Sequence, residues 1–138
     1  MQKFSLLAGV LALAGAALPG QAFAACSGNP MNQNQLNAVF PGNTVCAQRG
    51  SERWQEYHQL GGALIDYKLG QGHPVDPTKQ VGSWAIEGNG SGARMAYDYG
   101  NGVVYRYQVY AGGASYSFCN GNELHDATVR PGQQPCGF

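Results

Sequence analysis

Residues 81–118 alternate polar and apolar side chains in short segments, and three glycine-rich turns separate those segments. Alternation at every second position is typical of a β-strand with one buried face. The turns are Gly88-Asn89-Gly90-Ser91-Gly92, Gly100-Asn101-Gly102 and Gly112-Gly113. Asn and Gly are favoured in tight hairpins because those turns need positive φ angles. The pattern predicts an antiparallel meander.

Two short helices are predicted before this meander. Residues 31–39 can form the first, although the segment is rich in amides. Ser51 can cap the second over residues 52–58, where Trp54 and Tyr57 have helical spacing.

Further strands are expected on both sides of the meander. Residues 63–69 alternate as a strand, the prolines within residues 70–80 predict a loop, and residues 127–129 can form a last short strand. We therefore expect a mainly β domain with a short N-terminal helix. Its core would be an antiparallel meander of five or six strands, strongly curled or closed into a small barrel.

The tripeptide Gly82-Ser83-Trp84 resembles the Gly-x-Trp signature of lipocalin-like barrels and of small bacterial periplasmic inhibitor barrels. The resemblance implies a small lipocalin-like barrel and brings no activity with it. In lipocalins the motif lies on the first strand, whereas here it follows a long preceding segment. The strands predicted after it are too few for a complete eight-stranded barrel.

The first residues have the layout of a secretory signal peptide. A single cation, Lys3, precedes an uncharged apolar run over residues 4–18, and the triplet Ala22-Phe23-Ala24 follows it. The run is shorter than the ~20 residues that a membrane-spanning helix needs. We therefore expect residues 1–24 to be a signal peptide and residues 25–138 to form one periplasmic or secreted domain without a transmembrane segment.

The charge balance argues against nucleic acid as a partner. The chain has eight basic and eight acidic residues, and loss of Lys3 with the signal peptide leaves seven against eight. A net charge so close to zero provides no general attraction to phosphate backbones or anionic lipids.

All four cysteines follow the predicted signal peptide, and their even number predicts disulfides. Metal ligation is less favoured because the C-x-x-C spacing of zinc sites is missing. Of the three possible pairings, we expect Cys26 with Cys46 and Cys119 with Cys136, since each closes a short loop. Cys26 also follows small residues, so a lipid anchor there is a minor alternative.

One face of the predicted sheet is unusually rich in tyrosine. Buried phenols need hydrogen-bond partners, so these side chains either form a partly hydrated core or line a site for a flat, sugar-like or apolar ligand. The residues of the candidate ligand site are Trp84, Tyr97, Tyr99, Tyr105, Tyr107 and Tyr116; Met95 and Phe118 share their face.

Charged side chains offer weaker candidates. The pattern Glu-x-His occurs at Glu56 and at Glu123, but we expect no metal site. Positions two apart diverge on the helix predicted for the first pair, and the second pair is expected to be two surface residues of the last loop. Arg94 and Arg106 lie on the face opposite the tyrosines. The cross-strand neighbour of Arg106 is Asp98 or Ala96, and we expect an ion pair between Arg106 and Asp98.

No motif for nucleophilic catalysis or phosphate binding is present. We therefore expect a non-enzymatic protein without a cofactor, which holds an unknown small ligand on the tyrosine and tryptophan face. The alternative is a protein-interaction module, such as a periplasmic inhibitor of a secreted hydrolase or a surface-assembly component. That module would bind an extracytoplasmic protein through residues 70–80 or 120–134.

Overall fold

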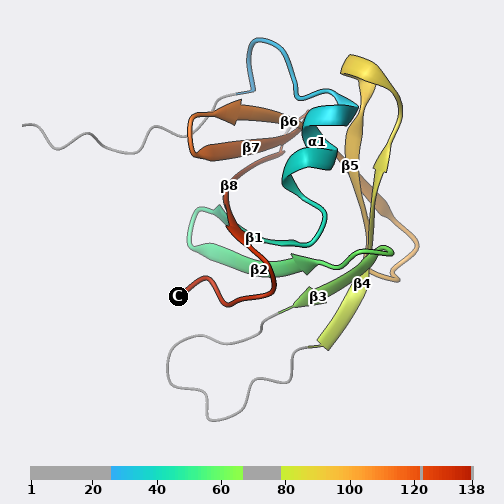
Figure 1. The fold of residues 1–138 in the computed structure, drawn as a ribbon, viewed down its shortest axis with the longest axis vertical. Helices are drawn as coiled ribbons and strands as arrows, with labels where there is room; N and C mark the ends of the chain where they lie inside the picture. The colour runs from blue at the N-terminus through green and yellow to red at the C-terminus, as the bar shows by residue number, and fades with distance from the viewer. Residues whose placement is uncertain (1–25, 67–78, 122, 138) are drawn as a thin grey trace, which may run out of the picture.

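The structure is a computed structural model that describes residues 26–66, 79–121 and 123–137. Eight antiparallel strands follow one another in sequence order and close into a barrel, and the helix α1 (Gln33–Val39) precedes them (Figure 1). The strands are β1 (Asn43–Arg49), β2 (Glu52–His58), β3 (Ala63–Asp66), β4 (Lys79–Glu87), β5 (Arg94–Asp98), β6 (Val104–Gly112), β7 (Ser115–Asn120) and β8 (Glu123–Pro131). A short 3-10 turn, η1 (Gly90–Gly92), lies between β4 and β5.

The predicted fold class is confirmed: the chain forms an antiparallel meander barrel with a short helix before the strands. The strands number eight and not the five or six expected, because β1, β2 and β3 precede the Gly82-Ser83-Trp84 element and complete the barrel. Residues 52–58 form strand β2 and not a helix. The last strand runs from Glu123 to Pro131, well beyond the predicted residues 127–129.

Other predictions fall partly outside the described residues. The strand predicted over residues 63–69 is described as far as Asp66. Of the loop predicted over residues 70–80, the described part is Lys79 and Gln80, which already belong to β4. The predicted signal peptide also lies outside the described part of the chain.

The barrel closes because β8 pairs with β1 along six residue pairs, from Asn43 opposite Pro131 to Gln48 opposite Asp126. Gly82 permits a close approach between β4 and β5. A Cβ atom there would collide with the backbone carbonyl of Asp98, so only glycine fits the predicted Gly-Ser-Trp element at this point.

Helix α1 seals one end of the barrel (Figure 1). Asn32 caps it, accepting a hydrogen bond from the backbone of Gln35 while the Gln35 side chain accepts one from the backbone of Asn32. Leu36 and Phe40 point into the barrel and are fully buried. The Phe40 ring lies edge-on at 5.5 Å from the ring of Phe118. The helix therefore supplies the apolar closure that the strands leave open at this end.

The predicted disulfide pairing is wrong. Cys26 is bonded to Cys119 and Cys46 to Cys136, with sequence separations of 93 and 90. The prediction assumed short loops, whereas barrel closure brings the terminal segments beside strands distant in sequence. The Sγ atom of Cys26 that a lipid anchor would use is bonded to Cys119 in this structure. In the chain-entropy model each bridge contributes about 4–5 kcal/mol by restricting the unfolded chain.

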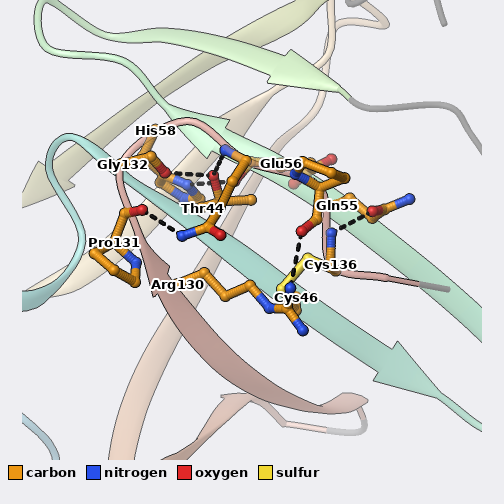
Figure 2. The surroundings of a disulfide bond; sticks show 11 residues. Thr44, Cys46, Gln55, Glu56, His58, Arg130, Pro131, Gly132 and Cys136 are labelled. Atoms are coloured by element: carbon orange, nitrogen blue, oxygen red, sulfur yellow. Dashed lines mark hydrogen bonds between the residues drawn. A yellow bond between two sulfur atoms is a disulfide. The ribbon is translucent and has the colours of Figure 1, made fainter.

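The segment after β8 crosses the outer face of β1 and β2, where Cys136 meets Cys46 (Figure 2). Its backbone is fixed by polar side chains that point outward from the barrel. The backbone N–H of Cys136 donates to Oε1 of Gln55 at 2.7 Å, and Oγ1 of Thr44 donates to the carbonyl of Gly132 at 2.7 Å. The segment thereby buries Thr44 and Gln55 on the outer wall, leaving the interior free of the disulfide.

Candidate ligand-binding cavity

The tyrosine-rich face predicted from the sequence is the inner face of the barrel. On β5 and β6, Met95 lies opposite Tyr107 and Tyr97 lies opposite Tyr105. The same alternation places Trp84 of β4 opposite Tyr97 and Phe118 of β7 opposite Val109. These strands therefore direct their aromatic rings toward one interior.

The rings do not fill that interior. A cavity of about 510 Å³ remains toward the end opposite α1. Its lining combines aromatic rings, small apolar side chains and a few charged groups: Val45, Ala47, Arg49, Trp54, Glu56, Asp66, Val81, Tyr97, Tyr99, Asn101, Tyr105, Tyr107, Phe118, Glu123 and His125. This volume lies within the range of small-molecule sites, and such a mixed lining is typical of them. We call this feature the barrel cavity and its open end the mouth.

The structure brings four of the six candidate site residues together around the barrel cavity: Tyr97, Tyr99, Tyr105 and Tyr107. The other two lie toward the closed end. Trp84 packs 5.1 Å from the ring of His58, and its Nε1 donates to the carbonyl of Gln59 at 3.0 Å.

Tyr116, the remaining candidate, packs edge-on against Phe40 at 5.5 Å. It thus contributes to the apolar plug below the cavity and does not line the cavity itself. The aromatic face predicted from alternation therefore has two parts. Trp84 and Tyr116 pack in the core at the closed end, and the four tyrosines nearer the mouth line the cavity.

A completely buried histidine, His58, lies beneath the cavity lining. Nδ1 of His58 lies 3.1 Å from the carbonyl oxygen of Glu56, which can only accept, so Nδ1 carries the proton. Nε2 then accepts from the Tyr97 hydroxyl at 2.9 Å. Burial lowers the pKa of His58 to about 4, and burial raises the pKa of Tyr97 well above its usual value. Both groups are neutral near pH 7 and act as a fixed polar contact within the core.

Glu56 lies two residues before His58 on β2 and faces the same interior. Its carboxylate accepts hydrogen bonds from the Tyr99 hydroxyl at 3.0 and 3.2 Å. Burial is the main cause that raises the pKa of Glu56 to about 7; the hydrogen bond from Tyr99 opposes the shift, and the charge of Asp66 adds to it.

A second polar group surrounds Glu123 at the mouth. Its carboxylate accepts from the Tyr107 hydroxyl at 3.1 Å and lies 3.4 Å from Nε2 of His125. Arg49 lies 3.7 Å from the other oxygen of Glu123 and stands over the ring of Trp54 at 5.9 Å. The hydrogen bonds to His125 and Tyr107 lower the pKa of Glu123, whereas burial raises the pKa of Tyr107 to about 12.

The sequence prediction missed the acidic corner of this cavity. The sequence predicts a helix over Glu56, which does not place its side chain beside the tyrosines, and the candidate ligand site does not include Asp66 or Trp54. Glu56 and Asp66 are directly opposite each other on β2 and β3. The signal was available in the alternation of Trp54, Glu56 and His58, which share one face only if the segment is a strand.

The two Glu-x-His pairs do face the interior, as strands require. Among the described residues, however, no three His, Cys, Asp or Glu side chains gather closely enough to hold a metal ion.

Arg94 and Arg106 are exposed on the outer wall, opposite the tyrosines, as predicted. The pairing predicted for Arg106 is wrong: its Nε contacts Glu87 at 2.6 Å instead of Asp98. Arg106 lies opposite Ala96 in the sheet, which leaves its long side chain free to reach Glu87 on β4. This outer pair is remote from the cavity and serves below as a reference.

Comparisons with protein-family models, with curated proteins and with solved structures yield no match. The two disulfides indicate an oxidising, extracytoplasmic compartment. Over the described part of the chain, no helix has the length and apolar character needed to cross a membrane.

Proposed function

We propose that this protein is an exported, non-enzymatic binding protein that holds a small ligand inside the barrel cavity. The observation that carries the proposal is the cavity itself: about 510 Å³ of space bounded by aromatic rings, with one end sealed by α1. A barrel whose only task was stability would gain by filling such a space, because close packing adds dispersion contacts and excludes voids.

The polar groups of the cavity support the same function. Tyr99, Tyr105 and Tyr107 each present a hydroxyl near the mouth, held by Glu56, Asn101 and Glu123 respectively. In small-molecule sites, a few polar groups that point into a mainly apolar cavity fix the orientation of the ligand. This arrangement favours binding over catalysis, since each of these hydroxyl groups is already hydrogen-bonded to a neighbouring side chain.

The alternative function has less support. Of residues 120–134, proposed as a binding loop, nine form strand β8, which pairs with β7 along its first part and with β1 along its last part. Most of this segment is therefore part of the barrel wall and does not form a loop. The other proposed loop, residues 70–80, lies almost entirely outside the described residues.

The first test is the native mass of the mature protein purified from the exported fraction of its own host, compared with its denatured mass. A small molecule that is released on denaturation supports the proposal. A bare monomer with two disulfides favours interaction with another protein and counts against a resident ligand.

The second test probes the cavity directly with the neutral fluorescent dye N-phenyl-1-naphthylamine. We expect the wild-type protein to bind the dye and Ala47→Trp to lose binding, because Ala47 lines the cavity and a large ring there would occupy it. Ala38→Trp is the matched control, since Ala38 is exposed on α1. Dye binding that survives Ala47→Trp, or that is lost equally in both variants, would contradict binding in the cavity.

A further inference from the structure

The barrel cavity contains an arrangement that a neutral ligand would not require. Glu56 on β2 and Asp66 on β3 occupy directly opposite positions in an antiparallel pair, and both line the cavity. Like charges at directly opposite positions destabilise a sheet. Burial next to tyrosine rings adds to that cost, because the charged form of a carboxylate loses solvation.

Glu56 has no cationic partner among the described residues. The hydrogen bonds to its carboxylate, at 3.0 and 3.2 Å, both come from the Tyr99 hydroxyl. Arg49 is committed to Glu52 at 2.8 Å and to Glu123 at 3.7 Å. The described lining of the cavity thus contains three carboxylates, those of Glu56, Asp66 and Glu123, and one guanidinium, which contacts Glu52 and Glu123.

Aromatic rings stand beside the two carboxylates. The ring of Tyr99, whose hydroxyl contacts Glu56, lies 6.4 Å from Tyr97 in a stacked arrangement and 6.1 Å from Tyr105 in an edge-on arrangement. The faces of such rings attract cations, most strongly where water is excluded. Carboxylates and aromatic rings in one cavity therefore select for positive charge attached to an apolar body.

We infer that the ligand of the barrel cavity is an organic cation, an amine whose ammonium group binds between Glu56 and Asp66 and whose apolar or aromatic body lies against Tyr97, Tyr99 and Tyr105. The inference rests on the proposed function and specifies its ligand. An ammonium group supplies up to three donors, enough for both carboxylates. Anionic ligands are disfavoured by the three carboxylates of the lining.

A metal cation fits this corner less well. Calcium takes six to eight oxygen ligands and magnesium needs an octahedral set, whereas the described residues offer no cluster of three acidic, histidine or cysteine side chains. The cavity of about 510 Å³ also exceeds what a single ion occupies. The aromatic wall would have no role around such an ion.

The experiment compares three probes of similar size by calorimetry: 2-phenylethylammonium, neutral 2-phenylethanol and anionic 3-phenylpropionate, with calcium chloride as a fourth arm. We expect the ammonium probe to bind about tenfold or more tightly than the alcohol, as charge-assisted hydrogen bonds imply, and the anion to bind least. Equal binding of the ammonium and the alcohol, or binding of calcium in preference to both, would overturn the inference.

Matched variants localise the cation. Glu56→Gln and Asp66→Asn should each weaken the ammonium probe about tenfold while leaving N-phenyl-1-naphthylamine bound. Glu87→Gln removes a carboxylate from the outer wall and should change neither. If the neutral dye binds and the ammonium shows no preference, the proposed function stands and this inference fails; if the dye does not bind either, both fail.

Measuring the protons released on binding distinguishes direct contact between the ammonium group and Glu56 from a structural effect of the substitution. The groups around Glu56 are His58 on its own strand, Val45 opposite it on β1, Asp66 on β3, Tyr97 on β5 and Tyr99 directly after β5. Because the pKa of Glu56 is raised to about 7, an arriving ammonium should ionise it and release about half a proton at pH 7. Calorimetry in two buffers of different ionisation enthalpy measures that release, and Glu56→Gln should abolish it. Unchanged proton release in this variant would contradict the role of Glu56.

Discussion

The closed end and the mouth of the barrel use the same strands for opposite purposes. At the closed end, Phe40 and Leu36 of the α1 region fill the interior, and His58 is buried with both ring nitrogens occupied. At the mouth, Glu56 of the same strand faces open space and is held by one phenol. Strand β2 therefore carries both His58, whose two ring nitrogens are hydrogen-bonded in the core, and Glu56, whose carboxylate faces the cavity.

The contrast lies in packing and ionisation, and not in missing hydrogen bonds. In the described part of the chain, no buried side-chain nitrogen or oxygen lacks a partner. The closed end is stabilised by filled volume, whereas the mouth retains an unfilled volume and a carboxylate that is costly to ionise. Close packing is thus concentrated at one end of the barrel, and the unfilled cavity lies at the other.

The largest effect that would test this contrast is expected from Phe40→Ala. Phe40 is fully buried among Phe118, Tyr116 and His58, so its loss leaves a cavity. We expect a loss of about 3–5 kcal/mol in the free energy of unfolding, measured by urea denaturation. Tyr105→Ala at the mouth should cost less than half as much. Equal losses at the two positions would show that the ends do not differ in packing.

The next effect is an acid-dependent loss of stability at the closed end. The pKa of His58 falls from its usual 6.5 to about 4 in the folded state, so the unfolded chain binds the proton first. The contribution of His58 is complete above pH 6.5 and is lost as the pH falls toward 4, by about 3 kcal/mol. Urea denaturation across this range should show a smaller loss in His58→Gln than in the wild type. Parallel profiles would contradict the assignment.

Glu56 should give the opposite slope. Its folded pKa, about 7, lies above its usual 4.5, so the folded state binds the proton first and stability falls as the pH rises from 4.5 through 7. We expect Glu56→Gln to be more stable than the wild type by about 1–2 kcal/mol at pH 8 and equal to it at pH 4. Glu87→Gln, on the exposed outer wall, is the control. A variant that is less stable than the wild type at pH 8 would show that the Glu56 carboxylate is not a cost to the fold.

The smallest expected effect belongs to a hydroxyl at the mouth. The Tyr105 hydroxyl accepts one hydrogen bond, from Nδ2 of Asn101 at 3.3 Å, in an exposed turn. Thermal unfolding of Tyr105→Phe should therefore differ from the wild type by about 0.5 kcal/mol or less. Tyr110→Phe on the outer face of the same strand is the control. A large loss in Tyr105→Phe alone would place a structural contact where we describe an open binding surface.

The meander was predictable because its strands obey the simplest rule. In β5, β6 and β7 every second side chain points inward, and the inward side chains are apolar or aromatic, so alternation and glycine turns were sufficient. Strand β2 broke that rule because its inward residues include Glu56 and His58. Polar side chains inside a barrel produce a sequence pattern similar to that of a surface helix, and this is why a helix is predicted for residues 52–58.

The cavity was only half predictable for the same reason. Four of its tyrosines could be assigned from their shared face, but Asp66 joins the site solely through its register with Glu56. Neighbouring positions in a barrel depend on which strands pair, and the sequence around Asp66 does not specify that pairing. The disulfides were mispaired on the same ground, because the contact of β1 with β8 is set by closure.

That closure also determines the order in which the chain can become native. The seam joins Thr44 to Arg130, and each native disulfide spans at least 90 residues, so nothing local can complete the barrel. During synthesis Cys26 and Cys46 emerge long before their true partners, and a bond between them would be a trap that must be reopened. This non-native bond is avoided if the chain stays reduced and unfolded until β8 and Cys136 have been made. Passage through a translocation pore in extended form would have that effect.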